Sequence, residues 1–379
     1  MRNPNLRHIA LFTAFYPPHM GGVERYSVNL AEELVRQGYQ VTIITSACGE
    51  KRPEHEAITI LEIPSTSIMN DRFPLPLPTA KTVRTIKELM AMEVQAIIIQ
   101  TRYYPISLIG CIFARKRNLT PLVIDHSSGP LSREKNLIGA LLRGYERAIT
   151  HVVRKFCPVF SSVSTKGVEW LGKLGISAKG VTPNSIDCER FIGSSSNKDW
   201  RSSLGCGNKM LVLFAGRLIA EKGVSKLLAA AQELNNMNVP IHFAIAGSGP
   251  LENEVKNANL NNVSFVGKLN QSDLSSLMHA ADVFCLPSDY PEGLPTVLLE
   301  ASAQHCALIM SQTGGTEELV PNEYYGIVLS NTSKVEICKA LMFLLNNPEK
   351  LEQFKSSSFE NVKKNFSWSC TVNSILKLF

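Results

Sequence analysis

Residues 7–46 read RHIALFTAFYPPHMGGVERYSVNLAEELVRQGYQVTIITS, and this stretch decides the fold class. It opens with a short apolar run and closes with another, and each predicts a buried strand. Between them, apolar residues recur every three or four positions from Val23 to Leu34, which is the spacing of one helical face. Gly38 then marks the end of that helix. A strand, a helix and a second strand in this order predict a parallel βαβ unit.

The same alternation continues outward along the chain. Further short apolar runs predict strands at 96–100, 121–126 and 159–164, with amphipathic helices between them. The alternation pauses in a Ser/Gly/Asn/Lys-rich stretch that has no periodicity, and we predict a linker at 191–204. Strands and helices then resume, beginning with KMLVLFAGR at 209–217. We therefore predict two consecutive α/β domains with parallel sheets.

The bulk composition agrees with a globular protein of two domains. The chain has 379 residues, about two domains' worth, with 44% hydrophobic and 19% charged residues. Nine cysteines lie without any C-x-x-C pair, which argues against a zinc site or a disulfide framework and for a reducing cytoplasm. We see neither a signal peptide nor a membrane-spanning run, so we expect a cytoplasmic protein.

Charge is distributed unevenly between the two halves. Residues 1–190 hold 24 Lys and Arg against 16 Asp and Glu, whereas the remainder holds 15 against 17. A basic first half is suited to an anionic partner such as a membrane surface, and the alternative is simple scatter. No reader motif or basic–aromatic interleaving points to nucleic acid.

Ligands of open parallel sheets bind beyond the carboxyl ends of the strands, so the loops at those ends are the candidates for a binding site. In the first half, Gly21 and Gly22 precede a helix, where backbone N–H groups can meet an anion. His126 follows a strand and opens a Ser/Gly loop, VIDHSSGP, where it could hydrogen-bond a ligand. The alternatives are an ordinary turn and a histidine that stabilises its own loop.

In the second half, two loops stand out. LFAGRLIAEKG carries Arg217 and Lys222 past a strand, a pair of cations suited to a diphosphate. The alternative is a solvated surface pair that has Glu221 as its partner. SDYPEGLPTVLLEASAQ places Glu292 in a loop, Pro295 as the first helical residue and Glu300 inside the helix. Carboxylates at these points could accept hydrogen bonds from sugar hydroxyls, although each glutamate by itself could be a surface or helix-end residue. A third loop, SQTGGTEELV, also follows a strand and precedes a helix, and it contains a Gly-Gly turn.

Several familiar nucleotide-binding patterns are missing. The sequence has no P-loop, and AGSGP at 246–250 matches a dinucleotide fingerprint only weakly. It also has no D-x-D pair that would hold a metal ion with a nucleoside diphosphate. We therefore expect no metal or other cofactor, with the cations and helix ends neutralising the diphosphate.

Taken together, these segments resemble the retaining glycosyltransferases of family 4, which have the GT-B fold. The matching stretches, all in the family's order, include FYPPHMGGVERYSVNLAEEL, VIDHSSGP, FAGRLIAEKG, FVGKL, PEGLPTVLLEA and TGGTEELV. The resemblance implies two facing Rossmann-like domains, at 1–190 and 205–362, with the donor in the cleft between them. It also implies that a final helix at about 363–379 packs back on the first domain.

The resemblance further implies roles for individual residues. Arg217 and Lys222 would bind the donor diphosphate, Glu292 the transferred sugar and Glu300 the ribose. His126 would act near the reaction centre, so the catalytic set is His126, Arg217, Lys222 and Glu292. The donor would also contact eight further residues along the loops: Gly21, Gly22, Val266, Gly267, Gly293, Leu294, Pro295 and Thr296.

The implied activity is transfer of a hexose from a nucleotide-diphosphate sugar, with UDP or GDP as the nucleotide, to a sugar or lipid-linked glycan acceptor. Such an enzyme would serve polysaccharide, capsule, O-antigen or glycolipid synthesis, and could sit peripherally on the inner face of a membrane. The alternatives are a nucleotide-sugar epimerase of similar fold and a nucleotide-sugar-binding protein without catalysis.

Two departures from the family pattern affect these expectations. Pro183-Asn184-Ser185 stands where the family often has Pro-Asn-Gly, and Ser127 follows His126 where a glycine is common. The first concerns the hinge between the domains and the second the acceptor side.

Overall fold

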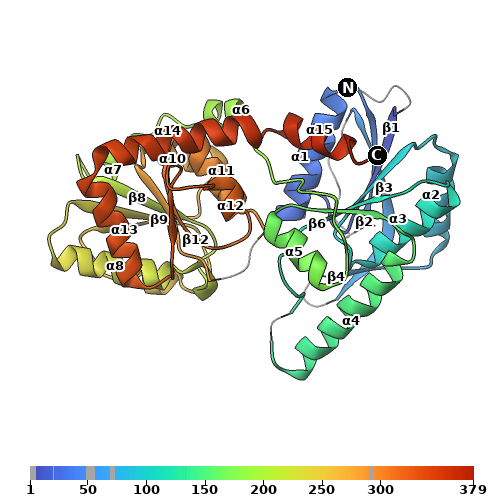
Figure 1. Ribbon diagram of the computed structural model, residues 1–379, viewed down its shortest axis with the longest axis horizontal. Helices are drawn as coiled ribbons and strands as arrows, with labels where there is room; N and C mark the ends of the chain where they lie inside the picture. The colour runs from blue at the N-terminus through green and yellow to red at the C-terminus, as the bar shows by residue number, and fades with distance from the viewer. Residues whose placement is uncertain (1–5, 20, 48–55, 69–72, 133, 290–292) are drawn as a thin grey trace. The chain divides into compact units, whose positions relative to one another are not determined.

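A computed structural model gives the fold, and it describes residues 6–19, 21–47, 56–68, 73–132, 134–289 and 293–379 (Figure 1). The chain forms two compact units. Unit 1 comprises Met1–Pro183 together with Trp368–Phe379, and unit 2 comprises Asn184–Ser367. Both are α/β units built on a mainly parallel sheet. No helix among the described residues has the length and hydropathy of a bilayer-spanning segment.

The unit 1 sheet has seven strands in the order β4-β3-β2-β1-β5-β6-β7. All neighbouring pairs are parallel except β3 and β4. The strands are β1 (His8–Thr13), β2 (Gln40–Ala47), β3 (Ile58–Ile68), β4 (Phe73–Pro76), β5 (Ala96–Gln100), β6 (Leu122–Asp125) and β7 (Val159–Ser162). The helices are α1 (Gly22–Arg36), α2 (Ala80–Ala91), α3 (Pro105–Lys116), α4 (Leu137–Arg154), α5 (Thr165–Lys173) and α15 (Trp368–Leu376).

Strand β1 explains why this sheet is buried on both faces. Ile9 and Leu11 belong to one hydrophobic cluster, whereas Ala10 and Phe12 belong to another, because successive side chains of a strand point to opposite faces. Helix α1 covers the first face and α2 and α3 contribute to the second. The opening stretch of sequence therefore forms the parallel β1–α1–β2 unit that its periodicity predicts.

The segment after β2 contains the one antiparallel strand pair of this sheet. Strand β3 continues to Ile68 and pairs antiparallel with β4. The prolines of FPLP did not exclude a strand because β4 lies at the edge of the sheet, where a missing N–H is tolerated.

The last helix of the chain, α15, belongs to unit 1. It packs beside α1, with the rings of Trp368 and Tyr26 at 5.2 Å in an edge-to-face arrangement. Val372 and Ile375 are fully buried in the same cluster. The preceding α14 ends at Asn365 and belongs to unit 2, so the chain returns to unit 1 at Trp368.

Unit 2 has a six-stranded parallel sheet in the order β10-β9-β8-β11-β12-β13. The strands are β8 (Met210–Ala215), β9 (Ile241–Ala246), β10 (Val263–Gly267), β11 (Val283–Leu286), β12 (Ala307–Ser311) and β13 (Ile327–Leu329). The helices are α6 (Cys188–Gly193), α7 (Trp200–Ser203), α8 (Val224–Asn236), α9 (Glu252–Lys256), α10 (Gln271–Ala280), α11 (Thr296–Ala303), α12 (Thr316–Leu319), α13 (Lys334–Asn346) and α14 (Pro348–Asn365), with the 3₁₀ turn η1 (Ala220–Lys222). The order reverses between β8 and β11, which is where ligands bind in sheets of this kind.

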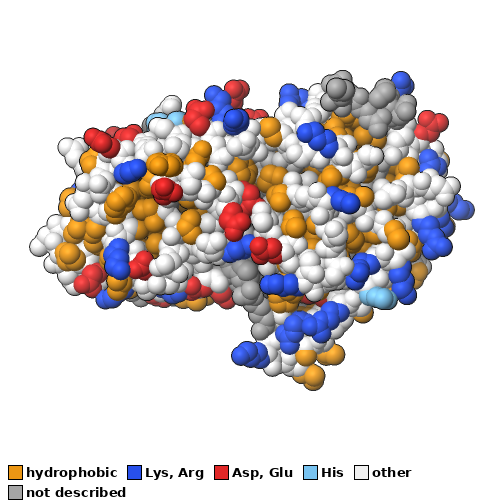
Figure 2. Space-filling view, viewed as in Figure 1, with side chains coloured by type: hydrophobic (Ala, Val, Ile, Leu, Met, Phe, Trp, Pro, Cys, Tyr) orange, Lys and Arg blue, Asp and Glu red, His pale blue; other side chains and the backbone are white. Residues whose placement is uncertain are grey.

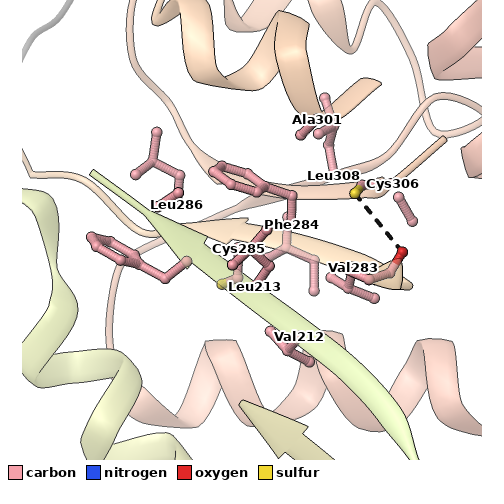
Figure 3. Packing of buried hydrophobic residues seen from close by; sticks show 14 of the residues in the cluster. Val212, Leu213, Val283, Phe284, Cys285, Leu286, Ala301, Cys306 and Leu308 are labelled. Carbon is pink, nitrogen blue, oxygen red and sulfur yellow. Dashed lines mark hydrogen bonds between the residues drawn. The ribbon is translucent and has the colours of Figure 1, made fainter. Parts of the chain in front are cut away.

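The core of unit 2 is continuous around its central strands. Figure 3 shows Val212 and Leu213 of β8, Phe284 of β11 and Leu308 of β12 packed together, with Ala301 of α11 above them. These strands are buried along their whole length because helices cover both sheet faces.

The predicted linker at 191–204 is wrong as a linker, because this stretch is part of unit 2. It contains the end of α6 and all of α7, and Trp200 is 2% exposed. Its serines satisfy polar groups of α10: Ser195 Oγ lies 2.9 Å from Ser275 Oγ, and Ser196 Oγ lies 2.8 Å from Ser276 Oγ. A Ser-rich stretch that would be flexible in isolation is thus fixed by hydrogen bonds that only the tertiary structure supplies.

Candidate functional site

In unit 2 the parallel strands place their carboxyl-end loops along one edge of the sheet. The loop after β8 carries Arg217 and Lys222, the loop after β11 leads through Gly293 into α11, and β10 ends at Gly267. The structure therefore brings the predicted unit 2 residues to one edge, as their positions after strands required. Glu292, the predicted sugar-contacting residue, lies outside the described residues.

The cation-bearing turn is held against the loop after β11. Glu221 O accepts hydrogen bonds from Asp289 N at 2.8 Å and from Ser288 Oγ at 3.0 Å. Gly223 closes the turn with φ at 77°, and a Cβ there would come within 2.0 Å of Pro287 O. Only glycine allows both this left-handed conformation and this approach, so the turn and the β11 loop are packed backbone to backbone.

A polar cluster fixes the point where the glutamate-bearing loop begins. Lys226 Nζ contacts both Asp289 Oδ2 and Thr332 Oγ1, and Thr332 Oγ1 donates to Asp289 Oδ1 at 2.5 Å. The Lys226 side chain comes from α8 and Thr332 from the segment before α13, so two elements converge on Asp289. Desolvation raises the pKa of Asp289, but the bonds from Lys226 and Thr332 outweigh it and the pKa is lowered.

The far end of that loop is clamped at Leu294, which is 2% exposed. Asn184 Nδ2 donates to Leu294 O at 2.5 Å, and a Cβ on Gly315 would lie 2.2 Å from Leu294 Cδ1. The Asn of the Pro183-Asn184-Ser185 segment thus acts within unit 2 as an anchor for this loop. The Gly-Gly turn after β12 has a matching role, because Gly315 gives Leu294 room.

Helix α11 begins one residue later than we expected. Pro295 is the N-cap, with φ −64° and ψ 119°, and Thr296 is the first helical residue. Pro295 lacks an N–H and no side chain caps the helix, so the N–H groups of its first turn face the loop end. Glu300 lies within α11 and is partly exposed.

Glycines 247 and 249 of the AGSGP motif serve packing between loops. A Cβ on Gly247 would lie 1.8 Å from Gly216 O, and one on Gly249 would lie 2.6 Å from Leu218 O. The β9 loop therefore supports the backbone on both sides of Arg217. Val266 and Gly267 lie at the neighbouring strand end, where a bulge and a φ of 72° turn the chain.

In unit 1, Gly21 and Gly22 lie where α1 begins. Gly21 is the N-cap, and a Cβ there would lie 2.4 Å from Glu24 Oε2. A Cβ on Gly22 would meet nothing within 4 Å, so this residue presents open backbone. The first helical turn is thus accessible at Gly22, as the predicted phosphate contact requires.

His126 lies just beyond β6, with its ring perpendicular to Tyr26 at 4.8 Å. Its Nε2 lies 2.6 Å from Gln100 Oε1, and because an amide oxygen only accepts, Nε2 carries the proton. Burial lowers the pKa of His126 to about 4, despite the opposing effect of Asp125. The ring is therefore neutral at pH 7, with Nδ1 as a hydrogen-bond acceptor.

The structure reveals a buried ionic cluster beside His126 that the sequence analysis missed. Arg102 is fully buried; its Nη1 donates to Asp125 Oδ2 at 2.5 Å and to Ser127 Oγ at 2.7 Å, and its Nη2 contacts Glu146 Oε1. Glu146 Oε2 accepts from Leu131 N at 2.9 Å. The cluster thus joins β5, β6 and α4 to the loop that follows His126.

Burial opposes charge on both Arg102 and Glu146. It would lower the pKa of Arg102, but Asp125 and Glu146 outweigh it and the pKa is raised. For Glu146, burial is the largest effect and the pKa is raised, although the Leu131 N–H and Arg102 act against it. Thr101, next to Arg102, has φ at 67°, an uncommon value for a β-branched residue. An arginine two residues after the strand AIIIQ was the available signal, but its partners are 23 and 44 residues away.

Among the described residues, no three His, Cys, Asp or Glu side chains gather closely enough to hold a metal ion. Within unit 2, the groups suited to an anionic ligand are the cations of the Arg217–Lys222 turn and the N-terminus of α11; within unit 1, they are the N–H groups at the start of α1.

Two family models match the chain and together cover most of it. Residues 20–190 match "Glycosyltransferase Family 4", and residues 196–360 match "Glycosyl transferases group 1". An uncharacterized glycosyltransferase of Methanocaldococcus jannaschii is 24% identical over 98% of this chain and 97% of its own. The GPI3 subunit of phosphatidylinositol N-acetylglucosaminyltransferase of Saccharomyces cerevisiae is 22% identical over 95% and 80%.

Solved structures share the fold at full length. Anabaena HepE in complex with UDP superposes with a TM-score of 0.76 at 17% identity, covering 98% of this chain and 99% of that one. Sucrose-phosphate synthase of Thermosynechococcus elongatus gives a TM-score of 0.75 at 21% identity, with 98% of both chains covered. The chain is therefore a glycosyltransferase of the GT-B fold and belongs to the family 4 and group 1 glycosyltransferases.

Proposed function

We propose that this glycosyltransferase transfers a hexose from a nucleoside-diphosphate sugar to a hydroxyl of a glycan or lipid-linked acceptor, with retention of configuration. The observation that carries the donor assignment is the packing of the Arg217–Lys222 turn against the loop that enters α11. This packing gathers two cations and a helix N-terminus at one sheet edge, a combination suited to a diphosphate. UDP is bound by the structural relative HepE, which supports UDP as the first nucleotide to test.

Within this proposal, each residue has a distinct task. Arg217 and Lys222 bind the diphosphate and stabilise its charge as the bond from the sugar carbon to the phosphate oxygen breaks. Glu300 and the backbone of Val266 and Gly267 hold the nucleoside. Gly293, Leu294, Pro295 and Thr296 line the path into α11, and Glu292 contacts the sugar.

The proposed chemistry at the sugar is a front-face displacement. The acceptor oxygen bonds to the sugar carbon on the face that the leaving phosphate vacates, and the acceptor proton passes to the leaving phosphate oxygen. The configuration is thereby retained and no separate base is needed. Because Arg217, Lys222 and helix N–H groups stabilise the developing negative charge, the step requires no metal ion. In unit 1, we assign Gly21 and Gly22 to the diphosphate and neutral His126 to the reacting sugar.

The donor can be identified by thermal shift and turnover against UDP and GDP sugars in EDTA. A donor that binds the folded protein raises its melting temperature. Release of the nucleoside diphosphate without added metal, and retention in the product by NMR, would support the proposal. Conversion of the donor to an epimer without acceptor would instead identify an epimerase, and binding without turnover a non-catalytic protein.

Substitution of the cation tests the site assignment. We expect Lys222→Ala to lose roughly tenfold to a hundredfold in kcat/KM, because a charge-assisted phosphate contact is removed. Glu292→Gln should lower kcat more than donor affinity. The matched control is Lys209→Ala, an exposed lysine at the opposite, amino end of β8. Wild-type kinetics in both site variants would disprove the assignment.

A further inference from the structure

The outward face of α4 is apolar, which is unusual for a surface helix. Leu137, Leu141 and Ile138 are 76%, 65% and 60% exposed, more than any other large hydrophobic residue in the described part of the chain. Figure 1 shows the N-terminal end of α4 projecting from the rest of unit 1, and Figure 2 shows hydrophobic side chains at that end with Lys and Arg side chains beside them. Packing within unit 1 therefore leaves these side chains uncovered.

The arrangement follows the helical period. Gly139, Glu146, Thr150 and Val153 are buried and share the inward face. The opposite face carries Leu137, Leu141, Gly144, Ala148 and Val152, all exposed and none of them charged. An ordinary surface helix has polar residues on that side. Helix α4 therefore has a buried face toward the core and, on the opposite side, a stripe of exposed apolar residues.

Cations border this stripe. Lys135, Arg147, Arg154 and Lys155 are exposed, and Arg143 is partly exposed. The acids nearby are Glu134, which is exposed, and Glu146, which faces inward and is paired with Arg102. The face therefore combines apolar side chains with a positive surround.

We infer that this face of α4 docks on a lipid bilayer that carries anionic headgroups. Exposed leucines and isoleucine would enter the boundary between headgroups and acyl chains, while the flanking cations meet the phosphates. A bilayer suits the face because the apolar residues lie on the projecting end of a helix, where a planar surface can reach them, and because the exposed cations beside them outnumber the one exposed acid, Glu134.

Helix α4 is also bonded to the loop that follows His126. Glu146 Oε2 accepts from Leu131 N, and Arg143 Nη1 donates to Ser132 O at 3.2 Å and Glu134 O at 2.7 Å. Docking of α4 would therefore hold the 126–132 loop beside the bilayer. This step rests on the proposed function, and it narrows the acceptor to a hydroxyl carried by a membrane-anchored amphiphile.

Vesicle co-sedimentation of the full chain tests the docking. We expect binding to vesicles of phosphatidylglycerol and phosphatidylcholine, weakening as salt is raised, and little binding to phosphatidylcholine alone. Leu137→Ser with Leu141→Ser should lower the partition coefficient by about tenfold or more, given the area each leucine would bury. Val83→Ser is the matched control, because Val83 is 54% exposed on α2 of the same unit.

Charge-reversal variants and a measurement of self-association test the docking independently. Lys135→Glu with Arg147→Glu should abolish the preference for anionic vesicles. Equal binding of wild type and the Leu137/Leu141 variant would overturn the proposal. So would light scattering that shows a wild-type dimer which the leucine variant converts to monomer, because a second copy would then cover the face.

The donor experiment separates this inference from the proposed function. The Leu137/Leu141 variant should keep the wild-type thermal shift with the donor, because α4 holds none of the residues assigned to it. A variant that loses vesicle binding but retains the donor shift supports the docking. Failure of every donor in the wild type would refute the proposed function and leave the vesicle result standing.

Discussion

Among single residues, His126 shows how the surroundings of a side chain determine its protonation state and its hydrogen bonding. His126 follows a strand, a position open to either a ligand contact or a structural role. Burial lowers its pKa so that the ring is neutral, and its bond to Gln100 leaves Nδ1 as the acceptor. A neutral histidine can accept a hydrogen bond from a sugar hydroxyl without adding positive charge beside the reacting carbon.

This environment predicts a dependence of stability on pH. The pKa of His126 is about 4 in the folded chain and about 6.5 when unfolded, so between these values the unfolded state binds more protons. Its stabilising effect is complete above pH 6.5 and is lost as the pH falls toward 4. We expect the stability difference between wild type and His126→Asn to shrink by about 1–2 kcal/mol from pH 7.5 to pH 5.

Urea unfolding at the two pH values, monitored by circular dichroism, measures that difference. His151→Asn is the control, because His151 is exposed on α4 and should show no such change. An unchanged difference for His126→Asn would mean that the ring titrates normally in the folded chain.

At the scale of elements, Arg102 connects two strands to a helix. Arg102 follows β5, Asp125 ends β6 and Glu146 comes from α4, and all three side chains are buried. Buried ion pairs contribute little net stability relative to apolar packing, but they are costly to break. The cluster is therefore better understood as a device that fixes the Ser127–Leu131 segment than as a source of stability.

Removal of the arginine tests this view. Arg102→Met should destabilise the protein by about 3–5 kcal/mol, because two buried carboxylates lose their partner. Adding Glu146→Gln should recover part of the loss, since one of the stranded charges is then neutral. Chemical denaturation measures both, with Lys256→Met at an exposed ion pair as the control. Full additivity of the two substitutions would contradict the coupling.

At the scale of the whole molecule, the chain leaves unit 1 at Pro183 and returns to it at Trp368. The last helix is as much a part of the unit 1 core as α1, because Trp368, Val372 and Ile375 are buried among its residues. Thr371 Oγ1 also donates to Pro183 O at 3.2 Å, joining the two crossing points within unit 1. Strand β1 and helix α15, which are far apart in the sequence, therefore share the core of one unit.

This topology predicts that damage to each unit stays local. Trp368→Ala should cost about 3–5 kcal/mol, because a large side chain is removed from a packed core. Hydrogen exchange should then increase in α1 and the unit 1 strands and stay unchanged in unit 2. Trp200→Ala is the matched control, since Trp200 is buried in unit 2 and should give the reverse pattern. Equal loss of protection in both units after either substitution would refute the separation.

Local patterns in the sequence were enough to predict the class of fold and the loops that form the candidate site. Buried parallel strands are nearly continuous apolar runs, so the strand at 96–100 was predicted with the bounds that β5 has. The site loops could be located because every parallel strand ends at the same sheet edge. The Gly-Gly turn that contains Gly315 was predicted from the sequence, since a turn needs only local chemistry.

Other features could be seen only in the tertiary structure, because they depend on partners that are distant in the chain. The stretch 191–204 is ordered by α10, the edge position of β4 tolerates its prolines, and Gly247 is required by the carbonyl of Gly216. No short sequence pattern links Arg102, Asp125 and Glu146, yet folding brings them together. Local periodicity indicates which face of a helix or strand is buried. Whether a charged side chain or a glycine backbone can be buried depends instead on a partner from an element that is distant in the sequence.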